Sequence, residues 1–65
     1  MKTEEIKKKI DVMINDYDHK IANINGLLVF ETDKQGIERA NKLISLLQTV
    51  IVDLLLIKRM LNQLD

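Results

Sequence analysis

The single histidine of this 65-residue sequence, His19, has neighbours that could hold a metal ion. On a helix, Asn15, Asp16 and Asn23 would share a face with His19, because they lie three or four residues from it. A protein zinc site needs more nitrogen or sulfur ligands than this, and the Glu-x-x-His and His-Glu-x-x-His patterns are absent. We therefore expect no metal and no cofactor, and we predict that His19 is an ordinary surface residue.

The acidic and hydroxyl side chains offer no catalytic arrangement either. The chain has no cysteine, and Ser45 and Thr49 lie in an apolar stripe with no histidine in helical register to act as a base. Asp53 interrupts the apolar segment VIVDLLLI without a nearby second carboxylate of the kind that hydrolysis requires. Because a buried, unpaired carboxylate is costly, Asp53 should be solvated, the alternative being an ion pair with another helix. The sequence predicts no enzyme and no catalytic residue.

Two basic clusters are the remaining charged feature. Lys7, Lys8 and Lys9 lie near the start and Lys58 and Arg59 near the end, so a helical hairpin would bring both clusters to one end of the molecule. Such a patch could contact phosphate, but the formal net charge is zero and the aromatic residues are one Tyr and one Phe. Nucleic-acid binding is therefore our second choice of function.

Helices must position these side chains. The chain has no Pro, Cys or Trp, and 46% of its residues are hydrophobic and 31% charged, a composition typical of helical proteins. A chain of this length buries only about 60% of the surface that its unfolded form exposes. Without disulfides or a structural zinc site, we expect stability to come from association with copies of itself or with another chain.

The first predicted helix covers about residues 3–30. Thr3 is the expected N-cap, and acidic residues follow in the first turn, where the helix dipole favours negative charge. The apolar residues recur every three or four positions but not strictly as heptads, so the helix should pack straight or with slight right-handed coiling. They are Ile6, Ile10, Met13, Tyr17, Ile21, Ile24 and Leu28, with Ile14 and Leu27 beside them. Ending the helix at Gly26 would leave the apolar residues 27–30 in a loop, so we favour an end near Phe30.

The second predicted helix covers about residues 33–64, after a turn at about 30–33. The segment Thr32-Asp33-Lys34-Gln35 fits a T-x-x-Q capping box, and two overlapping heptad series follow it. The expected oligomer core comprises Ala40, Leu43, Leu47, Val50, Ile51, Leu54, Ile57 and Leu61. A two-helix contact needs only a narrow seam. This wider face predicts an all-α, antiparallel two-helix hairpin that self-associates into a four-helix bundle, most simply as a homodimer.

Another apolar stripe lies on the opposite side of the second helix. Val52, Leu56 and Met60 follow one another by four residues, after Ser45 and Thr49. Contiguous apolar surface often marks an interaction site, and Met adapts to irregular partners. We therefore take Val52, Leu56 and Met60 as candidate partner-binding residues. The alternatives are scattered surface residues or a higher oligomer that buries them.

The same sequence gives an expectation for location. The start of the chain lacks the apolar segment and cleavage site of a secretory signal. The longest apolar run is broken by Asp53 and is shorter than the roughly 20 residues that cross a bilayer. We expect a cytoplasmic protein without membrane contact. Abundant Lys, Ile, Asn and Asp beside two Ala are typical of AT-rich genes of low-GC bacteria and their phages.

Together these features predict a small protein–protein interaction module, an adaptor, inhibitor or regulator of the kind that phages and mobile elements encode. Its expected partners are itself and an unknown protein. In chain size and expected architecture the sequence resembles the RNA-binding Rop hairpin dimers of plasmids. That resemblance implies the second possibility, a small RNA- or DNA-binding hairpin that uses the Lys7–Lys9 end.

Overall fold

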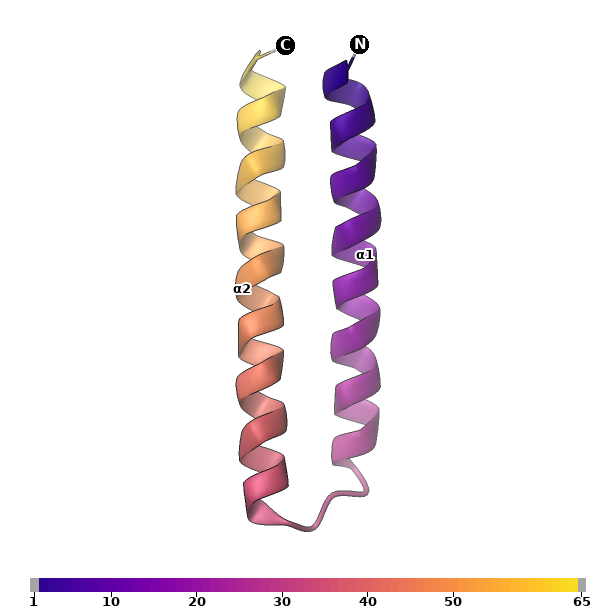
Figure 1. Cartoon of the computed structure of the whole chain (residues 1–65), viewed down its shortest axis with the longest axis vertical. Coiled ribbons are helices and arrows are strands. Elements are labelled where there is room, and N and C mark those ends of the chain that lie inside the picture. The colour runs from indigo at the N-terminus through magenta and orange to yellow at the C-terminus, as the bar shows by residue number, and fades with distance from the viewer. Residues whose placement is uncertain (1, 65) are drawn as a thin grey trace.

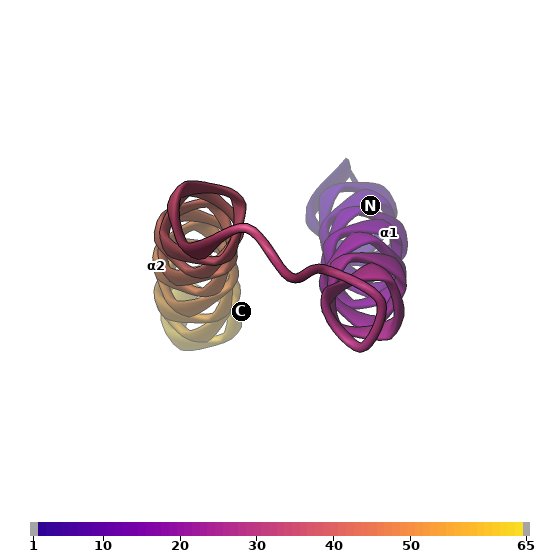
Figure 2. The ribbon, with the colours of Figure 1, turned by 90° about the horizontal axis from the view of Figure 1, so that it is seen from below.

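The computed structural model describes residues 2–64, which form two α-helices and a short connection. Helix α1 spans Lys2–Leu28 and helix α2 spans Lys34–Leu64. The helices lie side by side along their length, and both termini lie at the same end (Figure 1). Viewed along the helices, the two rods form a single layer with the connection crossing between them (Figure 2). The protein is an all-helical hairpin whose Cα atoms extend over 49 × 14 × 10 Å.

The ends of α1 differ slightly from those expected. The helix begins at Lys2, so Thr3 lies in its first turn and is not the N-cap. It continues through Gly26 and ends at Leu28, and the Phe30 N–H then donates to the Leu27 carbonyl at 3.1 Å. A Cβ on Gly26 would meet nothing within 4 Å, so this glycine is neither a cap nor a packing requirement.

The start of α2 is organised by two acidic residues. The Asp33 carboxylate accepts the N–H of Gln35 at 3.3 Å, which is the hydrogen bond of an N-cap. Glu31 folds over the same turn, where its Oε1 accepts the Asp33 N–H at 2.9 Å. A Cβ on Gly36 would lie 2.9 Å from the Glu31 side chain, so glycine leaves room for this arrangement. The cap is therefore Asp33, and the prediction that Thr32 caps α2 is wrong by one residue.

A narrow seam joins the two helices. The α1 residues that are not fully exposed alternate by four and three positions, and those of α2 do the same from Ile37 onward, as in a two-helix coiled coil. The α1 seam consists of Thr3, Lys7, Ile10, Ile14, Tyr17, Ile21, Ile24 and Leu28. The α2 seam consists of Ile37, Ala40, Ile44, Leu47, Ile51, Leu54, Lys58 and Leu61.

This seam corrects the predicted packing face of α1. Its positions follow a heptad pattern, which an apolar-only reading misses because Thr3 and Lys7 occupy two of them. Ile6 and Met13, which were assigned to the packing stripe, lie outside the seam at 44% and 43% exposure. The face of α1 that meets α2 is thus rotated away from the face that the apolar residues alone suggest.

The seam makes a thin core. Among the described residues, only Ile10 and Leu54 are buried, at 5% and 9% exposure. The accessible surface is 5316 Å², whereas a compact monomer of 7.6 kDa exposes about 4300 Å². The single hairpin therefore leaves about 1000 Å² more surface in water than a compact protein of its mass does.

Candidate interaction surfaces

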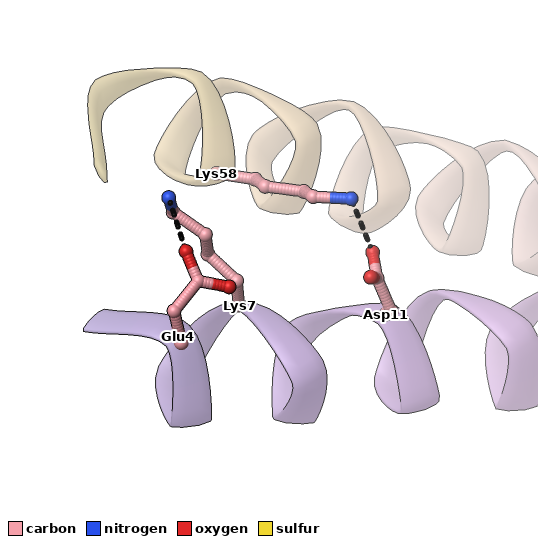
Figure 3. Close-up of polar contacts among 4 residues, drawn as sticks. All are labelled: Glu4, Lys7, Asp11 and Lys58. Carbon is pink, nitrogen blue, oxygen red and sulfur yellow. Dashed lines mark hydrogen bonds and ion pairs between the residues drawn. The ribbon is translucent and has the colours of Figure 1, made fainter. Parts of the chain in front are cut away.

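The end of the hairpin where the termini meet holds two ion pairs (Figure 3). Lys58 reaches from α2 to Asp11 on α1, with 2.6 Å between Nζ and Oδ1. On α1, the Lys7 Nζ donates to the Glu4 carboxylate at 3.2 Å. The side chains of Lys58 and Lys7 are only 33% and 12% exposed, because both residues occupy seam positions. Each stem covers apolar surface while its ammonium group reaches a carboxylate at the edge.

The structure divides the residues of the predicted basic patch into some that are paired with carboxylates and others that are exposed. The hairpin brings the segments of both basic clusters to one end (Figure 1). The side chains of Lys7 and Lys58 are largely covered and paired with carboxylates, whereas Lys8, Lys9 and Arg59 are exposed. The positive charge that this end offers to a phosphate is therefore smaller than the number of basic residues suggests.

The candidate partner-binding residues form an outer ridge on α2, defined as Val52, Leu56 and Met60. They are exposed at 54%, 48% and 63%, respectively, and lie away from the seam with α1. One turn before the ridge, the Thr49 hydroxyl donates to the Ser45 carbonyl at 3.0 Å. The two polar residues of this stripe are thus joined by a hydrogen bond, and its three apolar residues are exposed to solvent.

The two sides of the seam differ in chemistry. One side of the seam is formed by the residues that directly precede every second seam residue. These residues recur every seven positions, and most of them are apolar on both helices. We call this side the apolar flank; it consists of Ile6, Met13 and Leu27 of α1 and Leu43, Val50, Ile57 and Leu64 of α2. Lys20 holds the remaining α1 position, with its Nζ 5.1 Å from the centre of the Tyr17 ring. The apolar flank is 36% to 77% exposed.

The opposite side is the polar flank. It consists of Glu4, Asp11, Asp18 and Asn25 of α1 and Asn41, Gln48, Leu55 and Asn62 of α2. Leu55 is its apolar member, at 51% exposure. Because the chain reverses between the helices, equivalent flanking positions of α1 and α2 fall on the same side of the pair. Each flank is therefore a continuous strip along the hairpin.

The predicted oligomer-core residues fall into two groups. Those in the seam against α1 are Ala40, Leu47, Ile51, Leu54 and Leu61. Those on the apolar flank are Leu43, Val50 and Ile57. Sequence reasoning did not assign any α1 residue to such a flank, although Ile6, Met13 and Leu27 share a seven-residue period that could have identified it. The wide apolar face of α2 thus has one part covered by α1 and one part in water.

The remaining polar candidates lie on the surface. Across residues 2–64, no group of three or more His, Cys, Asp or Glu side chains is placed to hold a metal ion. His19 is exposed, as are Asp16 and Asn23 on the same helix. Asp53 is also exposed, seven residues before Met60 and therefore on the same side of α2 as the outer ridge.

Helix α2 is long and apolar enough, by length and composition, to cross a membrane. Its 31 residues include an 18-residue window with a mean hydropathy of 1.7. The prediction that excluded a membrane segment considered only the longest uninterrupted run, and it was therefore too strict. The core helix of a soluble protein passes the same test, but such a helix is mostly buried, whereas only 6% of this window is buried within the hairpin. In this hairpin, inserting α2 together with α1 would also carry Asp11, Asp16 and Asp18 into hydrocarbon, which is costly.

No family model, curated protein or solved structure matches this chain. A function must therefore be argued from the chemistry of the surfaces described above.

Proposed function

We propose that this chain is a small non-enzymatic protein–protein interaction module, an adaptor, inhibitor or regulator, that acts in the cytoplasm. In this proposal, antiparallel hairpins associate into a homo-oligomeric four-helix bundle, and the outer ridge binds another protein. The observation that carries it is the exposure of Val52, Leu56 and Met60, at 54%, 48% and 63%, on a helix that already packs against α1 through a different face.

The ridge has the residue spacing of a helical docking face. Its three residues are spaced by four, so they share one helical face and can enter a hydrophobic groove or pack against a partner helix. Arg59 lies seven residues after Val52 on the same face and is exposed, so it supplies a charged rim. Asp53 is exposed seven residues before Met60 and adds an acid to this rim, so we infer a partner surface with an apolar centre and charges of both signs at its edge.

Capture from a lysate of the source cell tests this proposal with matched variants. Leu56→Asp places a charge on the ridge, whereas Val12→Asp places the same charge on α1, at a site that is 61% exposed and away from the ridge. A protein retained by the wild type and by Val12→Asp, but lost with Leu56→Asp, would support the ridge as the binding site. The mass of the assembly should be unchanged in all three.

Two results would count against the proposal. If Leu56→Asp dissociates the assembly, the ridge is a contact between subunits and not a partner site. If every captured protein also binds Leu56→Asp equally well, the ridge does not recognise a partner.

A second candidate function is RNA or DNA binding at the end that carries the basic clusters. It is favoured by the exposure of Lys8, Lys9 and Arg59 at that end. Binding of this kind must weaken steeply as salt rises, because each phosphate contact releases counterions. Gel shifts with mixed nucleic acid should then be lost in the Lys8→Gln/Lys9→Gln variant and retained in Lys42→Gln, a control on the exposed surface of α2. Undetectable or salt-insensitive binding rules this function out.

A further inference from the structure

The apolar flank of the hairpin lacks a covering element among residues 2–64. We infer that a second copy of this chain docks on the apolar flank, so that two hairpins pack flank to flank with their polar flanks and outer ridges in water. This inference rests on the self-association in the proposed function and assigns it to one surface. That surface includes Met13 of α1 as well as Val50 and Ile57 of α2.

The area of uncovered surface fits a second copy. The hairpin exposes 5316 Å², about 1000 Å² more than a compact monomer of its mass. Removing that excess from both partners would bury about 2000 Å², the upper end of the range for standard stable interfaces. The excess therefore matches the size of one dimer contact.

The charge distribution also selects this flank. The positions of the apolar flank carry no acidic residue, and Lys20 is the one basic residue among them. Packing polar flanks together would instead desolvate Glu4, Asp18 and the ion pair between Asp11 and Lys58. A two-fold contact uses the same patch on both subunits, so the patch must tolerate its own copy. The apolar flank meets this condition, and the polar flank does not.

Lys20 can be accommodated at such a contact. Its Nζ lies over the Tyr17 ring at 5.1 Å from the centroid, at the exposed surface of α1. A lysine stem can cover apolar surface while its ammonium group stays at the wet edge. One lysine on each subunit therefore need not be buried when the flanks meet.

The test compares two positions of α2 that are two residues apart. Ile57 lies on the apolar flank at 46% exposure and Leu55 on the polar flank at 51%, so Ile57→Asp and Leu55→Asp differ mainly in the side on which they place a charge. Sedimentation equilibrium of the full chain should give twice 7.6 kDa for the wild type and for Leu55→Asp. Ile57→Asp should weaken the dimer Kd by at least about 100-fold, because a two-fold contact carries the charge twice.

A second measurement covers the case in which Ile57→Asp unfolds. The chain has no native cysteine, so Ile57→Cys and Leu55→Cys each introduce a single thiol without a charge. The thiol at position 57 should react with a maleimide at least about tenfold more slowly in concentrated than in dilute protein, since the dimer covers it. The thiol at position 55 should react at the same rate at both concentrations.

The outcomes separate this inference from the proposed function. If Leu55→Asp dissociates the dimer and Ile57→Asp does not, or if the two thiols react alike in a stable dimer, the apolar flank is not the interface although self-association stands. A wild type that remains monomeric at 7.6 kDa overturns both self-association and this inference. Binding of such a monomer to lipid vesicles that Ile57→Asp abolishes would assign the flank to a membrane surface instead.

Discussion

Replacing Lys58 with leucine tests whether a side chain at this seam position stabilises the fold more through apolar packing than through an ion pair. Within the α2 seam, Lys58 is the one charged residue, and it lies between Leu54 and Leu61 in the heptad pattern. Its Nζ holds the Asp11 carboxylate at 2.6 Å. Leucine would continue the apolar seam but leave Asp11 without this partner.

The structure gives the expected magnitude. The Lys58 side chain is 33% exposed, so about two-thirds of a leucine would be buried there. A fully buried leucine contributes about 1.5–3 kcal/mol, which gives about 1–2 kcal/mol for this site before the contribution of the lysine stem is subtracted. The Asp11 side chain is 54% exposed, so solvent screening limits the lost ion pair to about 0.2–1 kcal/mol. The lysine stem already supplies part of this gain, so once the stem and the ion pair are subtracted we expect Lys58→Leu to raise the free energy of unfolding by no more than about 1 kcal/mol per chain.

Urea denaturation followed by circular dichroism measures this change. All variants must be compared at one protein concentration, because association also stabilises the folded state. Asp11→Asn is the companion variant, and it should cost no more than about 1 kcal/mol since the carboxylate is half exposed. A loss of stability in Lys58→Leu would refute the reasoning, because the ion pair would then outweigh apolar packing at this position.

Three further predictions address the helix interior, the helix start and the cellular location. Gly26→Ala should stabilise the protein by about 0.5–1 kcal/mol in thermal melts, because Gly26 is helical and a Cβ would meet nothing within 4 Å; a lower Tm would contradict this. Asp33→Ala should cost about 1 kcal/mol by removing the cap on the Gln35 N–H, whereas Thr32→Ala should be nearly neutral. A larger loss for Thr32→Ala would restore the capping box that the sequence suggested. On cell fractionation the chain should stay in the soluble fraction, and retention in carbonate-washed membranes would instead support a membrane-spanning role for α2.

Local signals in the sequence were sufficient to predict the two helices. Helical periodicity and the capping signal at Thr32-Asp33-Lys34-Gln35 locate α1 and α2 to within about two residues at each boundary. The choice between Thr32 and Asp33 as the cap could not be made from residue type, because both side chains are good caps and only the backbone geometry selects one.

The pairing of helix faces was harder to predict because polar residues take part in it. Lys7 and Lys58 occupy seam positions, where their long stems pack and their charged ends reach carboxylates. A packing face assigned from apolar residues alone is therefore displaced around the helix from the observed seam. The outer ridge could be found from α2 alone, whereas joining the seven-residue apolar series of α1 and of α2 into one flank requires the two helices to be placed together. A surface shared by two elements depends on their relative rotation, which neither element's sequence specifies by itself.

The two chain termini lie at one end of the hairpin, and the connection between the helices lies at the other end (Figure 1). A copy tethered by either terminus would stand upright from its support, with the turn residues Val29 and Phe30, 80% and 82% exposed, at the free tip of a rod that extends 49 Å. Immobilisation through either chain terminus would therefore leave both long sides of the hairpin accessible to a binding partner. A fluorophore attached to either terminus would lie at the same end of the hairpin.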